Sequence, residues 1–446
     1  MRKRPTSALV IGLGASGLAA ARLLADSGSA VTVTDRRTEA ELAGVLEALP
    51  PGIRTALGGH PAGLLDSTGL VVTSPGVPSD APILLEARRR GIAVVTEIEL
   101  AWRHRPDALL VAVTGSNGKS TVTSMTAAIL AASGIDTAAG GNLGPPASEL
   151  VLSGGWDAWV LEVSSFQAEA LTAMRPAVAV LLNLSQDHLE RHPDMEAYAA
   201  AKYRLLAFQD PGDTAVLNRD DPLSAAAPTA ARKRFFSLLN DADGALRDDE
   251  LVVDGEPLMP ASGLGVAGRH NAANALAATL AALAAGADRD AAREALARFE
   301  GLPHRHRVVV ESGGVRWVDD SKATNVGATL AGLEGYPPRS VHLILGGLAK
   351  GQDFTVLAPA VRRAAARVYL IGRDAETIAA ALGDAAPIER CGTLPEAVRR
   401  ARAAARAGET VLLAPACASF DQFEDYAARG DAFRELAAGE EVVPCR

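Results

Sequence analysis

Short runs of β-branched residues alternate with longer stretches rich in alanine and leucine along most of this chain. The run SALVIGL is followed by SGLAAARLLADSG and then by AVTVTD, and similar pairs recur further on. Short strands that alternate with helical segments indicate βαβ units, in which the strands are parallel and helices cover the sheet. The pattern therefore predicts an α/β fold with parallel sheets.

The strand-like runs fall into three series. The second series opens at DALLVAVTG and continues with DAWVLEV and AVAVLLNLS, and the third includes VRWVDDS, SVHLILGG, ARVYLIG and ETVLLAPA. A length of 446 residues suits about three domains, and we place the boundaries near residues 102 and 303. The expected domains are 1–102, 103–302 and 303–446. Within the second, LRDDELVVDGEPLMPASGLG predicts a small hairpin insertion with Asp254 and Gly255 at its turn.

Composition excludes several classes of protein. Apolar residues make up 48% of the chain, so each domain can bury a core, whereas the net charge is −9 and aromatic residues make up only 4%. A nucleic-acid binder needs a basic surface or stacking rings, so we expect no nucleic-acid partner. The three cysteines, Cys391, Cys417 and Cys445, are odd in number and lack C-x-x-C spacing. This argues against a disulfide framework or a zinc site and fits a reducing cytoplasm.

The first 25 residues imitate a signal peptide, because basic residues precede an apolar run. Three glycines interrupt that run, and the strand-like AVTVTD continues the α/β pattern after it. No stretch of about 18 uninterrupted apolar residues occurs, so we expect no transmembrane helix and no membrane partner.

The first glycine-rich loop follows the first predicted strand. Gly12, Gly14 and Gly17 match G-x-G-x-x-G, and Asp35 ends the next strand. This is the dinucleotide-binding pattern, in which a helix N-terminus approaches a diphosphate and the acid meets a ribose hydroxyl. The pattern leaves NAD or FAD, another nucleotide diphosphate, or tight packing without a ligand as alternatives. Arg36 and Arg37 follow the acid and face either a ligand or solvent.

The second glycine-rich loop is VAVTGSNGKST, residues 111–121, which leads from a strand into the helical stretch TVTSMTAAILAAS. It reads G-x-x-G-K-S, two residues shorter than the usual phosphate-binding loop, yet it offers the same groups. Backbone N–H groups of residues 115–119 are expected to surround phosphates, and Lys119 to reach the outer ones. A hydroxyl of Ser120 or Thr121 is expected to ligate Mg²⁺. This loop predicts an ATP site, with an accidental turn as the alternative.

Polar residues follow the next two strands of this series. Glu162 ends DAWVLEV, where a Mg²⁺ ligand belongs beside a phosphate loop; the alternative is that the following SSFQ only caps a helix. His188 lies in LSQDHLERH after the next strand, and the order of residues there differs from H-E-x-x-H, so we reject a zinc-protease site. Lys202, in EAYAAAKYRLL, is expected on pattern alone to be a solvated lysine of an amphipathic helix.

The third series ends its strands in further polar clusters. VDDSKATN, LGGLAKGQDF and APACASFDQFEDYAARG each follow a strand. Because the carboxyl ends of parallel strands converge on one crevice, lysines and hydroxyls there suit a small anionic substrate. The residues concerned are Asp320, Ser321, Lys322, Thr324, Asn325, Lys350, Ser419 and Tyr426.

With these motifs assembled, the chain resembles the Mur ligase family over nearly its whole length. The motifs are TGSNGKST, GGNLG, LEVSSFQ, LNLSQDHLERH, GRHNAANALAA, GLPHRHRVV, DDSKATN, LGGLAKG and APACASFDQF. Within that family, SKATN and ACASFDQF are typical of the D-glutamate-adding member. The resemblance implies a Rossmann-like N-terminal domain, a central P-loop ATPase-type domain and a Rossmann-like C-terminal domain. It also implies a cytoplasmic enzyme of peptidoglycan precursor synthesis, which we expect to be a monomer.

The resemblance assigns roles to residues. It resolves the first loop as a site for UDP rather than NAD, through Gly14, Ala15, Ser16, Asp35, Arg37, Ser74, Gly76 and Asn142. ATP is expected to contact Gly115, Ser116, Asn117, Gly118, Lys119, Ser120, Thr121, Asn274, Arg305 and Asp320. One Mg²⁺ is expected at Ser120 and Glu162, and a second at His188 and a carbamylated Lys202. The catalytic residues are expected to be Lys119, Glu162, His188 and Lys202. D-Glutamate is expected at Lys322, Thr324, Lys350, Ser419 and Tyr426.

The implied reaction is amide formation. The carboxylate of UDP-N-acetylmuramoyl-L-alanine attacks the γ-phosphate of ATP, and the amine of D-glutamate then displaces phosphate from the acyl phosphate.

Three alternative functions fit the sequence less well. The UDP-type first domain and SKATN argue against a folylpolyglutamate synthetase, a dehydrogenase leaves Lys119 without a role, and a non-catalytic sensor has no need of Glu162, His188 and Lys202 together.

Two positions depart from the family pattern. Relatives often carry an acid in the GGLAKG loop, where this chain has Leu348 and Ala349. This departure questions any charge network around Lys350. Relatives also carry Phe at the position of Tyr426, a change that is harmless if only the backbone is used there.

Overall fold

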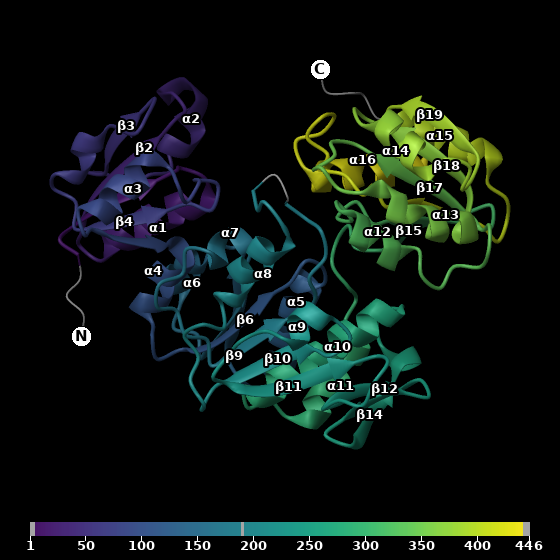
Figure 1. Cartoon of the computed structure of the whole chain (residues 1–446), viewed down its shortest axis with the longest axis horizontal. Coiled ribbons are helices and arrows are strands. Elements are labelled where there is room, and N and C mark those ends of the chain that lie inside the picture. The colour runs from purple at the N-terminus through teal and green to yellow at the C-terminus, as the bar shows by residue number, and fades with distance from the viewer. Residues whose placement is uncertain (1–4, 189–190, 440–446) are drawn as a thin grey trace. The chain divides into compact units, whose positions relative to one another are not determined.

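The computed structural model describes residues 5–188 and 191–439, which form α-helices and three β-sheets (Figure 1). The chain divides into two compact units. The first contains residues up to 183 together with 199–263 and 273–297, and the second contains 184–198, 264–272 and the chain from 298 onward. The predicted α/β class is therefore confirmed, and each of the three expected strand series forms its own sheet.

The first sheet is entirely parallel, in the order β3-β2-β1-β4-β5. The last four residues of its middle strand, β1, alternate between two cores. Ala8 and Val10 pack into one apolar cluster, whereas Leu9 and Ile11 pack into another on the opposite face. Both faces are thus covered, as in a doubly wound sheet. The strands are β1 (Ser7–Ile11), β2 (Ala30–Asp35), β3 (Arg54–Leu57), β4 (Leu70–Thr73) and β5 (Ala93–Thr96).

The helices of this region connect the parallel strands. The N1 position of α3 is a proline, and Thr96 accepts a hydrogen bond from Glu99 to cap α4, so both helix starts follow common capping rules. The helices are α1 (Ala15–Asp26), α2 (Glu39–Leu46), the 3₁₀ turn η1 (Ala62–Leu65), α3 (Pro82–Arg89) and α4 (Glu97–His104).

The second sheet has the order β14-β13-β12-β11-β10-β9-β6-β8-β7. Its strands are parallel from β7 to β12, and β13 and β14 add an antiparallel end. The predicted hairpin is confirmed, because Val253 pairs with Glu256 and the turn residues Asp254 and Gly255 have φ of 54° and 82°. The strands are β6 (Leu109–Thr114), β7 (Thr137–Gly141), β8 (Ala158–Glu162), β9 (Val178–Leu181), β10 (Thr214–Asn218), β11 (Arg232–Ser237), β12 (Gly244–Arg247), β13 (Glu250–Val253) and β14 (Glu256–Pro260).

The helices associated with these strands include the long apolar α10, most of whose alanines and leucines are buried. The helices are α5 (Lys119–Ala132), α6 (Ala147–Ser153), α7 (Ser165–Ala168), α8 (Met195–Tyr203), α9 (Pro222–Ala225), the 3₁₀ turn η2 (Ala261–Gly263), α10 (Arg269–Ala284) and α11 (Arg289–Arg298).

The third sheet, in the second unit, has the order β15-β16-β20-β17-β18-β19. Five strands are parallel. The edge strand β15, which the sequence pattern did not predict, pairs antiparallel with β16. The strands are β15 (Arg307–Ser312), β16 (Val315–Asp319), β17 (Val341–Gly346), β18 (Ala365–Ile371), β19 (Ile388–Gly392) and β20 (Thr410–Leu413). The helices are α12 (Val326–Gly332), the 3₁₀ turn η3 (Phe354–Leu357), α13 (Ala358–Ala364), α14 (Ala375–Leu382), α15 (Leu394–Ala404) and α16 (Tyr426–Ala438).

Within the described ranges, no helix is both long and apolar enough to cross a membrane. Cys391 and Cys417 are free thiols, and Cys445 lies outside the described residues.

Candidate active site

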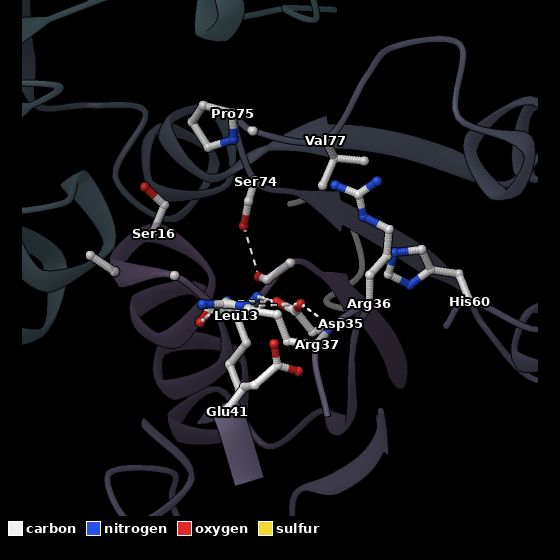
Figure 2. Close-up of a pocket in the computed structure, with 14 residues that line it drawn as sticks. Leu13, Ser16, Asp35, Arg36, Arg37, Glu41, His60, Ser74, Pro75 and Val77 are labelled. Atoms are coloured by element: carbon white, nitrogen blue, oxygen red, sulfur yellow. Dashed lines mark hydrogen bonds and ion pairs between the residues drawn. The ribbon is translucent and has the colours of Figure 1, made fainter. Parts of the chain in front are cut away.

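A pocket of about 660 Å³ opens at the carboxyl edge of the first sheet (Figure 2). The strand order reverses between β1 and β4, and ligands of open α/β sheets bind at such a switch point. Loops after four of the five strands line the pocket. The lining residues are Gly12, Leu13, Gly14, Ala15, Ser16, Asp35, Arg36, Arg37, Glu41, His60, Ser74, Pro75, Gly76 and Val77.

Two glycines of the first loop are required by close packing. A Cβ on Gly17 would lie 1.9 Å from the carbonyl oxygen of Gly12, so α1 meets the strand only because this side chain is absent. Gly12 itself has φ of 87°, and its carbonyl accepts a hydrogen bond of 2.8 Å from Ser74 Oγ. The N-terminus of α1 therefore faces the pocket, a position that favours an anion.

Asp35 links two of the residues that line this pocket, Leu13 and Arg37. Its Oδ2 accepts from Leu13 N at 2.7 Å and from the Arg37 guanidinium at 2.8 Å, and its Oδ1 accepts from Arg37 N at 2.9 Å and Nε at 3.1 Å. The Arg37 side chain, followed by the backbone N–H groups, keeps the pKa of Asp35 well below its usual range despite burial. These four hydrogen bonds use the acceptor sites of the carboxylate. A direct contact between Asp35 and ribose stays a prediction.

The second glycine-rich loop joins β6 to α5, as predicted from the sequence. Gly118 has φ of 85°, and a Cβ there would lie 2.5 Å from Asn274 Oδ1, a residue 156 positions later that was assigned to ATP. The loop and Asn274 therefore approach each other closely enough that only glycine fits at position 118.

Asn183 clamps this loop from the end of the neighbouring strand. The backbone N–H groups of Ser116 and Asn117 donate to the carbonyl and side-chain oxygens of Asn183 at 2.8 and 2.9 Å, and Asn183 Nδ2 donates to Asn117 O at 3.1 Å. The contact of these two N–H groups with phosphate stays a prediction. Their hydrogen bonds to Asn183 fix the shape of the loop.

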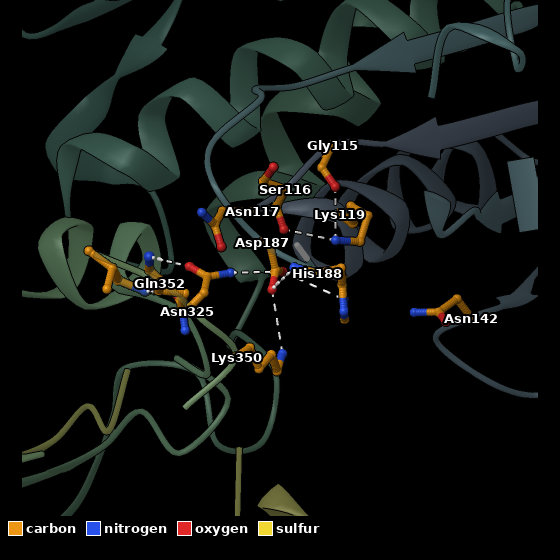
Figure 3. Close-up of polar contacts among 12 residues, drawn as sticks. Gly115, Ser116, Asn117, Lys119, Asn142, Asp187, His188, Asn325, Lys350 and Gln352 are labelled. Carbon is orange, nitrogen blue, oxygen red and sulfur yellow. Dashed lines mark hydrogen bonds and ion pairs between the residues drawn. The ribbon is translucent and has the colours of Figure 1, made fainter. Parts of the chain in front are cut away.

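Lys119 begins α5 and folds back over the loop. Its Nζ donates to the carbonyl oxygens of Gly115 and Ser116 at 3.0 and 2.8 Å (Figure 3). A cation held at the mouth of a loop of this type is placed to meet an incoming phosphate.

Glu162 lies at the end of β8 beside the start of α5, as the sequence pattern predicted. This carboxylate is 2% exposed and accepts from Ser120 Oγ at 2.5 Å and from Asn142 Nδ2 at 2.6 Å. Asn142 therefore contacts Glu162 and does not line the pocket of the first sheet. Ser164 and Gln167 form a capping box on α7, which confirms that SSFQ caps a helix while Glu162 has separate partners.

Lys202 differs from its expected environment. The side chain is 1% exposed, and Nζ donates to Gly115 O at 2.8 Å across 87 residues of sequence. The prediction of a solvated lysine is wrong, because α8 presents this residue to the phosphate loop rather than to solvent. Apart from the family resemblance, no feature of the sequence predicted this contact.

In the second unit, Asp187 accepts hydrogen bonds from several groups of the described residues. It accepts from the backbone N–H of His188 at 3.0 Å, from Asn325 Nδ2 at 3.2 Å and from Lys350 Nζ at 3.4 Å (Figure 3). His188 has φ of 56° and a partly exposed ring, with Nε2 3.7 Å from Asp187. The charge network around Lys350 therefore exists, although its acid comes from the segment before His188 and not from the GGLAKG loop. Leu189 and Glu190 lie outside the described residues.

Lys322 and Tyr426 also meet in the second unit. The Lys322 ammonium lies 3.8 Å from the centre of the Tyr426 ring, and Tyr426 O accepts a hydrogen bond of 2.7 Å from Ser321 Oγ. The ring of Tyr426 is therefore used directly, as a cation–π partner of the lysine.

The remaining assigned residues lie on loops of the same unit. Asp320 Oδ1 accepts from His306 N at 3.2 Å, and Thr324 N donates to Lys322 O at 2.8 Å. Ser419 is buried, and Arg305 is partly buried after α11. In the described part of the chain, no group of three or more His, Cys, Asp or Glu side chains is arranged to hold a metal ion.

Three family models match the chain in consecutive segments. They describe a Mur ligase MurD-like N-terminal domain at residues 6–96, a Mur ligase middle domain at 113–282 and a Mur ligase glutamate ligase domain at 304–417. Together they span most of the sequence, in the order of the three sheets.

Curated relatives match over nearly full length. A UDP-N-acetylmuramoylalanine–D-glutamate ligase from Anaeromyxobacter dehalogenans is 46% identical, with 97% of each chain covered. Proteins with the same name from Chromobacterium violaceum and Myxococcus xanthus are 44% and 42% identical, each over 96% of this chain and 96% and 97% of their own.

Solved structures share the fold at low identity. A pseudomurein peptide ligase type C from Methanothermus fervidus has a TM-score of 0.64 at 20% identity and covers 97% of this chain and 99% of its own. The MurF ligase from Thermotoga maritima in complex with ADP has a TM-score of 0.63 at 16% identity, with 96% and 97% covered.

Proposed function

Because the chain belongs to the Mur ligase family, we propose that it is an ADP-forming ligase that adds D-glutamate to UDP-N-acetylmuramoyl-L-alanine during peptidoglycan precursor synthesis. The observation that carries the proposal is the set of contacts at the phosphate loop. Lys119, the Ser120–Glu162 pair and Lys202 all lie on or against that loop. A dehydrogenase has no use for this arrangement, whereas transfer of a phosphoryl group needs it.

The proposed division of labour follows the three sheets. Residues 1–102 hold the UDP part of the acceptor, 103–302 hold ATP, and 303–446 hold D-glutamate. The pocket of the first sheet supports the UDP assignment, because a helix N-terminus for a diphosphate and Arg37 both face it. Asp35 acts there by fixing Leu13 and Arg37.

The phosphate loop fits a Mg²⁺ ion. A serine hydroxyl and a buried carboxylate are oxygen ligands, and Mg²⁺ is normally bound by one or two such groups together with substrate phosphates and water. We assign this role to Ser120 Oγ and Glu162 Oε2, which lie 2.5 Å apart in the structure. When bound, the ion would neutralise charge on the phosphates.

Lys202 is proposed to be carbamylated and, with His188, to ligate a second Mg²⁺. The burial of Lys202 supports this proposal, since the side chain is 1% exposed beside the phosphate loop and burial of a charged amine is costly. Carbon dioxide on the neutral amine converts a cation into an anion with two oxygens, and oxygen anions are the ligands that Mg²⁺ prefers. Isotope-edited NMR with ¹³C-bicarbonate tests this by detecting a carbamate carbon.

The protein's part in the chemistry is mainly positioning. Lys119 is placed to neutralise the γ-phosphate while the acceptor carboxylate attacks it. An acyl phosphate and ADP form, the amine of D-glutamate attacks the acyl carbon, and phosphate leaves. In the second unit, Lys322 and Lys350 offer cations for the carboxylates of D-glutamate, with Thr324, Ser419 and Tyr426 beside them.

We further propose that the protein acts as a monomer in the cytoplasm, since ATP and the UDP-linked acceptor are both available there.

The assay that tests the proposed function measures ADP release. Release that requires both D-glutamate and UDP-N-acetylmuramoyl-L-alanine is the expected result. Turnover of NADH without ATP hydrolysis, or ADP release with other amino acids only, contradicts the proposal.

A further inference from the structure

His60 lines the pocket of the first sheet, but neither the sequence motifs nor the proposed function assigns it a role. It follows β3, a short strand whose mixed polar sequence hides it from pattern analysis. The ring is half-buried, and Figure 2 shows it beside Arg36, at the opposite side of the pocket from Ser16.

The hydrogen bonds around His60 determine its tautomer. Thr34 Oγ1 lies 2.9 Å from Gly59 O and 3.0 Å from His60 Nδ1. A carbonyl oxygen only accepts, so the single hydroxyl hydrogen of Thr34 is donated to Gly59. The Thr34 oxygen is then an acceptor toward the ring, and His60 Nδ1 must carry the hydrogen.

This assignment leaves Nε2 as a hydrogen-bond acceptor when the ring is neutral. Among the described residues, Nε2 has no hydrogen-bond partner. Burial, with a further contribution from Arg36, lowers the pKa of His60 and outweighs the opposing effect of Asp35, so the ring stays neutral at physiological pH. The other charged pocket residues, Arg37 and Glu41, are engaged with Asp35 and Thr38 respectively.

The position of His60 selects the part of the ligand that it meets. A diphosphate belongs at the N-terminus of α1, where Ser16 lies, and the nucleoside extends past the acid that ends β2. His60 lies on that far side. Resting on the UDP site proposed above, we propose that His60 Nε2 accepts a hydrogen bond from the uridine, either from the imide N–H of uracil or from a ribose hydroxyl, and so selects the nucleoside.

Two substitutions separate the nitrogens of the ring. His60→Asn keeps an N–H group near the Nδ1 position, where it can still donate to Thr34, and removes the outer acceptor. His60→Gln keeps a polar amide at the outer position. Isothermal titration with UDP should give about 3- to 10-fold weaker binding for His60→Asn, the loss of one hydrogen bond, and a change within about 2-fold for His60→Gln.

Analogues identify the donor. If the uracil imide donates, wild type binds CDP more weakly than UDP and His60→Asn loses that preference. If ribose donates, the same loss of preference appears with 2′-deoxy- or 3′-deoxy-UDP. Equal UDP affinity in all three proteins, or every preference kept in His60→Asn, overturns the role of His60 while leaving the UDP site intact. Wild type that fails to bind UDP overturns the proposed site itself, and this inference with it.

Discussion

Replacing Lys119 by alanine separates the two glycine-rich loops by function. The ammonium group is now held by the carbonyl oxygens of Gly115 and Ser116, at 3.0 and 2.8 Å, and is expected to turn to phosphate when ATP binds. Alanine is the best helix former, so the first position of α5 tolerates the change. The variant should fold and lose phosphoryl transfer.

The size of the loss follows from charge. A unit charge about 4 Å from the transferred phosphoryl group contributes about 4 kcal/mol at the effective dielectric constant of a protein surface. Each 1.36 kcal/mol is a factor of ten in rate, so kcat/KM for ATP should fall about 10³-fold. The affinity for UDP should stay within about 2-fold, because the described residues that line the pocket of the first sheet all lie between positions 12 and 77.

The assay combines ADP release, measured with a coupled enzyme, and isothermal titration with UDP. Lys233→Ala is the matched control, since it removes the same charge from an exposed position on β11. The control should keep both readouts. If UDP binding collapses in Lys119→Ala, or if ADP release survives, the assignment of ATP to the second loop is refuted.

Three further predictions concern packing, charge and pH. Gly17→Ala should abolish UDP binding before it affects binding of ATP, because the new Cβ would lie 1.9 Å from Gly12 O; titrations with both nucleotides check this. Lys202→Met, which keeps volume in the buried site, should keep its melting temperature within a few degrees while ADP release falls at least 10²-fold, and an active variant contradicts the role of Lys202. Burial raises the pKa of Glu97 to about 7, so its contribution to stability is present below the ordinary value of 4.5 and is lost as pH rises through 7. Urea unfolding should show wild type losing about 3 kcal/mol more than Glu97→Gln between pH 4.5 and 8.5, and parallel curves would exclude this ionisation.

The sequence predicted the fold where local patterns suffice. Glycines at loop positions 17 and 118 are required by backbone conformation or close approach, and such constraints appear directly in the sequence. Strand-end residues such as Glu162 were also predictable, because parallel strands bring their carboxyl ends to one edge.

Contacts between distant segments could not be predicted in this way. The burial of Lys202 depends on a carbonyl 87 residues away, and the acid opposite Lys350 is 163 residues away. Helical periodicity says which residues share a face, but not what that face meets. His60 was missed for a related reason, since the strand before it is short and polar and gave no signal.

The path of the chain gives the phosphate loop a second consequence. The backbone leaves the first unit immediately after Asn183, returns at residue 199, leaves again after residue 263 and returns at 273. Asn183, Lys202 and Asn274, which lie next to three of these crossings, all meet the loop at residues 115–118. Residues next to the segments that connect the two units therefore contact the phosphate loop. The residues that hold the phosphate loop in shape are thus also the residues at which the chain re-enters or leaves the first unit.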